Sequence, residues 1–166
     1  MRTNFVPVLL LFFCFLNFPV LADDNDVSLK NSRRIHQLVA ELLEVVDKRV
    51  EQKHQGNFPG TNVGLIGPVQ DILSNENDVD VLMGFAMALR GYEWAGPETV
   101  AVSFVYETAW GQAVRRIEEI GGPEALHNLE LMRMSRMYDG AYSLILREAI
   151  DRLKAKEEQS KSQKTP

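Results

Sequence analysis

Cysteine is almost absent from this chain: the 166 residues include only Cys14, which lies in an apolar N-terminal stretch. If that stretch is removed as an export signal, the remaining chain has neither a thiol nor a disulfide. This excludes cysteine nucleophilic catalysis and a disulfide framework. A domain of about 150 residues buries roughly 68–70% of its surface and can fold without such crosslinks. An exported, cysteine-free domain of this size suits a bacterial periplasm.

Basic residues are also few relative to acidic ones. Loss of Arg2 with the signal takes Lys and Arg from 18 to 17 against 23 Asp and Glu, a net charge of −6. Nucleic acid and anionic lipid both attract basic surfaces, so the composition argues against either as a partner. An acidic surface is compatible with a basic protein partner.

The N-terminal stretch has the three parts of a secretory signal. Arg2 provides the positive start, residues 6–16 form the apolar centre, and Val20-Leu21-Ala22 places compact residues before a cleavage site. We therefore predict a signal peptide over residues 1–22, cut after Ala22, and no stable membrane anchor after the cut.

Two alternatives to cleavage are an uncleaved anchor and a lipid at Cys14. An anchor needs about 20 apolar residues, whereas residues 5–22 are fewer and contain two prolines and an asparagine. A lipidated cysteine would follow a small residue, but Phe13 precedes Cys14.

Strand alternation bounded by hairpin turns is missing as well, whereas apolar residues recur at spacings of three and four. The pattern predicts an all-α fold of about five to six helices without a sheet, arranged as a compact bundle or an array of helix pairs. Residues 23–156 form this single domain, and the polar residues 157–166 are expected to be a disordered tail. The expected helices cover residues 28–55, 68–74, 79–90 (capped by Asp78), 97–120 and 123–156, the last with a kink or short break at Asp139-Gly140.

Two features of these helices allow more than one interpretation. A Gly-Pro pair precedes three of the helical runs, at Gly67-Pro68, Gly96-Pro97 and Gly122-Pro123. Proline is favourable at the first position of a helix, so each pair is a helix start signal. They indicate either a helical-hairpin repeat or three independent uses of one start signal. The expected helix 97–120 has apolar residues on more than one face, which suits a dimer and a central buried helix equally well.

Metal-ligand patterns are weak. The three histidines include His127, three residues before Glu130, but a di-iron bundle site uses the reverse order in two copies. Methionines cluster at residues 83–87 and 132–137, and thioethers with His127 could bind copper(I). Methionine also fills irregular helical cores. We predict a core role for Met83 and Met87, and neither a metal site nor a cofactor.

Glu107 is the best candidate for a catalytic acid. It lies between Tyr106 and Trp110 in a helix expected to face the core, and an apolar pocket can raise the pKa of a carboxyl enough to make it a general acid. The alternative is a carboxylate at the helix edge that pairs with a nearby arginine. The Gly56–Gly67 loop lacks the Gly-Lys-Ser/Thr ending of a phosphate loop.

Aromatic residues between helices are the candidate partner-binding residues. Tyr92-Glu93-Trp94 lies in a helix connection, where a tryptophan is not needed to form the turn, and Phe58 lies in the glycine-rich loop. Tryptophan and tyrosine are common binding anchors. The alternative is that Trp94 folds back onto the core. Glu93, with Glu98 and Asp78, would add an acidic surface for a basic partner.

These patterns favour an exported, non-enzymatic domain that binds another protein, such as an immunity or inhibitor protein or an envelope assembly helper. Two other classes stay open: a cell-envelope hydrolase or lyase that uses Glu107, and a carrier of a small ligand or metal. A homo-oligomer is compatible with the pattern.

Overall fold

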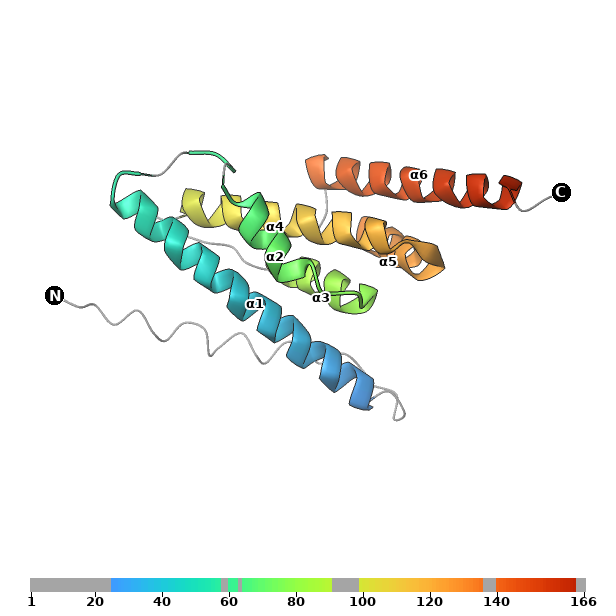
Figure 1. Ribbon diagram of the computed structural model, residues 1–166, viewed down its shortest axis with the longest axis horizontal. Helices are drawn as coiled ribbons and strands as arrows, with labels where there is room; N and C mark the ends of the chain where they lie inside the picture. The colour runs from blue at the N-terminus through green and yellow to red at the C-terminus, as the bar shows by residue number, and fades with distance from the viewer. Residues whose placement is uncertain (1–24, 58–59, 63, 91–98, 136–139, 164–166) are drawn as a thin grey trace.

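The chain is all-helical in the computed structural model, which describes residues 25–57, 60–62, 64–90, 99–135 and 140–163 (Figure 1). This part of the chain contains no strand, and it forms a compact helical bundle as the sequence predicts. Its six helices are α1 (Asn25–His54), α2 (Ile66–Leu73), α3 (Val79–Arg90), α4 (Thr99–Ile120), α5 (Gly122–Met134) and α6 (Gly140–Gln163). Among the described helices, none is both long enough and apolar enough to cross a bilayer.

Several helix ends follow the expected start signals. Asp78 caps α3 as predicted, because its Oδ1 accepts the backbone N–H groups of Asp80 and Val81, both at 3.0 Å. Pro123 lies in the first turn of α5. The short helix α2 begins at Ile66, two residues before Pro68, so this proline lies within the first turn and not at its first position.

The C-terminal region divides into two helices near the break expected at Asp139-Gly140. Helix α5 ends at Met134, and Ser135 is extended, with its N–H donated to the carbonyls of Leu131 and Met132. Helix α6 then packs against α5 and continues to Gln163. The region is therefore a helix pair, and residues 157–163 are helical where a disordered tail was expected.

Helix α4 is the centre of the bundle. It packs against each of the other five helices, and α3 also contacts α5. Helices α1 and α6 make no contact with each other and lie on opposite sides in Figure 1. This arrangement explains the apolar residues on more than one face of α4: the described chain itself covers most of them, as a central helix requires, while Val100 near its start is exposed.

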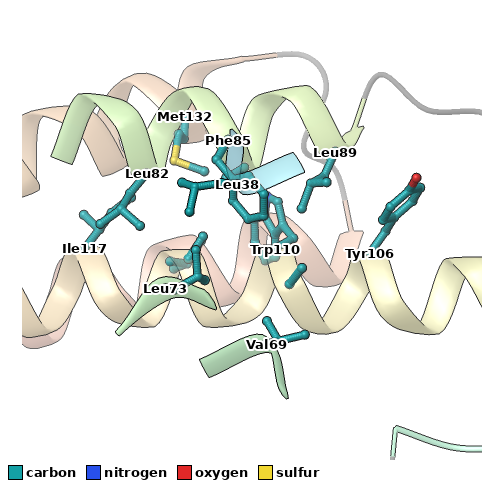
Figure 2. Packing of buried hydrophobic residues seen from close by; sticks show 14 of the residues in the cluster. Leu38, Val69, Leu73, Leu82, Phe85, Leu89, Tyr106, Trp110, Ile117 and Met132 are labelled. Atoms are coloured by element: carbon teal, nitrogen blue, oxygen red, sulfur yellow. The ribbon is translucent and has the colours of Figure 1, made fainter. Parts of the chain in front are cut away.

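The hydrophobic core surrounds Trp110 of α4. The Trp110 side chain is 1% exposed, and its ring meets the Tyr142 ring of α6 edge to face with centroids 4.7 Å apart. Figure 2 shows side chains from α1, α2 and α3 directed toward this region, including Leu38, Val69 and Phe85. One continuous core thus joins both sides of α4.

The glycine-rich connection after α1 is fixed at two points. Leu65, at the start of α2, is buried in the core. On α1, the buried Arg49 donates hydrogen bonds to the Gln52 side chain (3.1 Å) and to the Thr61 carbonyl. Burial lowers the pKa of Arg49. The connection is therefore attached to α1 by a buried guanidinium.

Helices α1 and α3 approach closely at Gly84. A Cβ atom at this position would lie 2.5 Å from Cδ1 of Ile35, too close for two carbon atoms. We expect Gly84→Leu to lower the free energy of unfolding by about 1–3 kcal/mol, because the larger side chain forces α1 and α3 apart. Urea denaturation followed by circular dichroism would measure the change.

Gly111 provides the matched control for that substitution. It also lies inside a helix, α4, but a Cβ added there meets no atom within 4 Å. Gly111→Ala should raise the free energy of unfolding by up to about 1 kcal/mol, because alanine has the higher helix propensity. If Gly84→Leu were as stable as the parent, the close packing of α1 on α3 would be wrong.

Candidate functional site

A buried carboxylate, Glu76, organises the turn between α2 and α3. Glu76 is 7% exposed, and its Oε2 accepts a hydrogen bond from Arg34 Nε of α1 at 2.7 Å. Its Oε1 accepts the backbone N–H groups of Asn77 and Asp78, both at 3.0 Å. Both carboxylate oxygens are thus engaged, and the turn is attached to α1.

The charge state of Glu76 follows from these contacts. Burial alone would raise its pKa, but the Asp78 amide, the Arg34 guanidinium and the Asn77 amide all favour the anion. Together they outweigh burial and hold the pKa of Glu76 below its ordinary 4.5. Glu76 is therefore a structural anion at neutral pH and not a proton donor.

Arg116 of α4 attaches the same turn from the other side. Its Nε donates to the Glu76 carbonyl oxygen at 3.1 Å, and its Nη2 donates to Asn77 Oδ1 at 2.7 Å. The next connection is between α3 and α5, where the buried Asn128 donates to Asp80 Oδ1 at 2.7 Å. A chain of polar contacts therefore joins α1, the α2–α3 turn, α4 and α5.

A polar groove lies between α2 and α4 beside this network. Its volume is about 290 Å³, and it is lined by Gln70, Leu73, Ser74, Gln112, Arg115, Arg116 and Glu119. The four residues from α4 follow one another at spacings of three, one and three, so they share one face of the helix. Glu119 accepts hydrogen bonds from Arg115 Nε at 3.3 Å and from Arg116 Nη1 at 3.5 Å. The groove thus has two guanidinium groups around one carboxylate.

The proposed catalytic acid Glu107 lies on the exposed side of α4, while Tyr106, Thr108 and Trp110 beside it in the sequence are buried. Glu107 therefore lies outside the apolar core that its candidacy as an acid required, and its exposed position fits the alternative of a carboxylate at the helix edge.

The expected partner-binding residues belong to segments that the structure does not describe. Tyr92, Glu93, Trp94 and Phe58 all lie outside the described residues, as does Glu98. Asp78, proposed for the acidic surface, uses its carboxylate to cap α3. The interpretation of the aromatic connection as a binding site stays a prediction.

The methionine clusters divide between core and surface. Met83 and Met87 pack against the core as expected, and Met132 is fully buried. Met134 is 69% exposed, and His127 is exposed on the same helix. Among the described residues, no three His, Cys, Asp or Glu side chains are placed to share a metal ion.

Glu130, the expected neighbour of His127, is part of an ion pair between helices. Its Oε1 lies 2.8 Å from Lys154 Nζ of α6. The hydrogen bond from Lys154 lowers the pKa of Glu130, and the charges of Lys154, Arg133 and His127 act in the same direction. Glu130 therefore contributes to the pairing of α5 with α6.

Exposed apolar side chains occur on both helices of the α5–α6 pair and were not identified from the sequence. They are Leu131, Met134, Leu144 and Ile145, close in sequence to the turn that joins the helices. The buried stripe of α6 runs through Leu146, Ala149, Ile150 and Leu153. Leu144 lies off this helical spacing, which is the sequence signal that could have marked it as exposed, whereas Ile145 lies four residues before Ala149, at the edge of the stripe.

The fold defines the class of this chain, an all-α helical bundle. The chain matches no protein-family model, no curated protein and no solved structure. Its candidate sites are therefore argued from its own residues and geometry.

Proposed function

We propose that this chain is an exported, periplasmic, non-enzymatic domain that binds another protein, such as an immunity or inhibitor protein or an envelope assembly helper. The observation that carries the proposal is the pair of exposed apolar residues on each helix of the α5–α6 pair, 40–69% exposed. Exposed apolar clusters rimmed by polar residues commonly mark protein–protein contacts. Glu148 and Asp151 follow Leu144 on the exposed side of α6, which favours a basic partner.

The two carboxylates held by arginines support a binding role over a catalytic one. Glu76 is held by Arg34, and Glu118 of α4 accepts two hydrogen bonds from Arg152 of α6, at 2.8 and 2.9 Å. The Arg152 hydrogen bond lowers the pKa of Glu118 despite its partial burial. A glycosidase-type acid requires the opposite, a raised pKa. Both carboxylates thus act in helix pairing.

The test is affinity purification of the tagged protein from its native envelope, expressed with its own signal and analysed by mass spectrometry. We expect one stoichiometric protein partner and an N-terminus at Asp23. The double substitution Leu144→Ser and Ile145→Ser should reduce recovery of the partner at least tenfold, because it removes exposed apolar contacts while leaving the buried stripe of α6 unchanged.

The matched control is Ile66→Ser, which removes an exposed isoleucine from α2 on another part of the surface. It should leave recovery of the partner unchanged. A clean monomer without a partner would overturn the proposal. Loss of the partner on Trp94→Ala, with Leu144 and Ile145 substitutions neutral, would place the contact on the aromatic connection.

A further inference from the structure

We infer that the groove between α2 and α4 binds a peptide carboxylate. This surface is separate in the fold from the exposed residues of α5 and α6, and its residues belong to other helices. The inference therefore goes beyond the proposed function and does not depend on it. Three properties of the groove carry it: a fixed arginine, a weakly held arginine–glutamate pair, and two side-chain amides available for a peptide group.

Arg116 is the fixed element of the groove. Its contacts with the Glu76 carbonyl and Asn77 Oδ1, at 3.1 and 2.7 Å, set the plane of the guanidinium. The Glu119 contact, at 3.5 Å, is longer and weaker. A guanidinium has five N–H donors, and these contacts use three of them. Arg116 can thus offer further donors to a ligand without changing its position, so its side chain loses little conformational entropy on binding.

Arg115 and Glu119 form the part of the groove that a ligand can open. Their side chains are 64% and 49% exposed, and the Nε–Oε1 distance is 3.3 Å. Strong charge-assisted hydrogen bonds are shorter, about 2.7–2.9 Å, and exposed ion pairs stabilise a fold little. Glu119 can therefore swing into solvent at low cost and leave two guanidinium groups for an incoming carboxylate.

Gln70 and Gln112 favour a peptide over a simple anion. They face the groove from α2 and α4, and in the described part of the chain their amides make no hydrogen bond. Each amide offers both donors and an acceptor, the complement of a backbone peptide group. The carbonyls at the end of α2 do not oppose an anion strongly, because Leu73 O accepts Glu76 N–H and Asp71 O accepts Ser74 Oγ–H.

The test is a titration of the isotope-labelled protein, followed through the nitrogen resonances of the Gln70 and Gln112 amides and the Arg115 Nε. The probe is acetylated trialanine with a free C-terminal carboxylate, and its amide-capped form is the comparison. We expect the free acid to shift these resonances saturably and the capped form to leave them unchanged. A capped peptide with one internal glutamate has a side-chain carboxylate but no terminal one. It therefore tests whether the groove binds a glutamate side chain or the C-terminus of a chain.

Two substitutions should act in opposite directions. Arg115→Gln should weaken binding of the acid about tenfold, because it removes a charge-assisted contact. Glu119→Gln should strengthen binding about threefold, because it removes the competing carboxylate. The control is Arg147→Gln, the same charge change at an exposed position of α6, which should have no effect.

Three results would overturn the inference. They are equal shifts with acid and capped peptides, equal binding of acetate and peptide, and an effect of Arg147→Gln as large as that of Arg115→Gln. Since Arg115→Gln and Glu119→Gln leave α5 and α6 unchanged, failure here would not affect partner recovery, and loss of the partner would not affect this titration.

Discussion

Trp110→Ala should lower the free energy of unfolding by about 3–5 kcal/mol, the largest effect expected for a single substitution in this chain. Trp110 is buried on the central helix α4 and meets the Tyr142 ring of α6 at 4.7 Å. Alanine would remove this aromatic contact and leave a cavity between both sides of the bundle. Urea denaturation monitored by circular dichroism measures the loss directly.

Trp110→Phe is the matched control, because it keeps an aromatic ring at the same position. It should cost less than the alanine variant, since part of the volume and of the edge-to-face contact with Tyr142 is retained. A cost below about 1 kcal/mol for Trp110→Ala would contradict a tightly packed core around this side chain.

Glu76→Ala should lower the free energy of unfolding by about 2–3 kcal/mol. The substitution removes the 2.7 Å contact with Arg34 and the two amide contacts at the α2–α3 turn. Hydrogen bonds to charged groups each contribute about 1.5–3 kcal/mol, and the partial exposure of Arg34 limits the total because water can replace its lost partner. Glu76→Gln keeps a carbonyl acceptor for the amides and should cost less.

Glu76 should also make the free energy of unfolding depend on pH in the acidic range. Because the folded protein holds the pKa of Glu76 below its ordinary 4.5, the unfolded chain takes up a proton first as pH falls. The contribution of Glu76 is therefore complete above about pH 4.5 and is lost as pH falls through the lower folded-state pKa. The melting temperature of Glu76→Gln should fall less steeply than that of the parent as the pH is lowered through this range. Part of the pH dependence of stability should remain in this variant, because the pKa of Glu118 is also lowered in the folded protein. If the melting temperatures of the variant and the parent fell equally steeply with pH, the charged state of Glu76 would be contradicted.

Local patterns predicted the helices of this chain well, because helix starts and stops depend on nearby residues. Asp78 caps α3, and the expected breaks at Gly56, Gly91 and Gly121 bracket helices that the structure contains. The break expected at Asp139-Gly140 marks the start of α6, but α5 already ends at Met134. Periodicity does not indicate this earlier end, because the Leu131–Met134 run continues a helical pattern. The extended conformation of Ser135 and the return of α6 onto α5 depend on tertiary packing, which a local pattern does not contain.

The candidate sites were less accessible to prediction, because they depend on contacts between residues far apart in the sequence. Glu76 pairs with Arg34 and Arg116, which lie about forty residues away on either side. Glu107 shows the converse error: two aromatic sequence neighbours suggested an apolar pocket, but adjacent helical positions point in different directions. Only the packed helices show that Tyr106 and Trp110 face inward while Glu107 faces outward.

The central position of α4 affects how the molecule can be divided. Both the α1–α3 side and the α5–α6 side complete their hydrophobic surfaces on this one helix, and α1 and α6 do not touch. In the described part of the chain, a fragment that ends before α4 and a fragment that begins after it would each expose the surface that α4 covers. We therefore expect the six helices of this part of the chain to unfold together, and neither fragment to keep the bundle by itself.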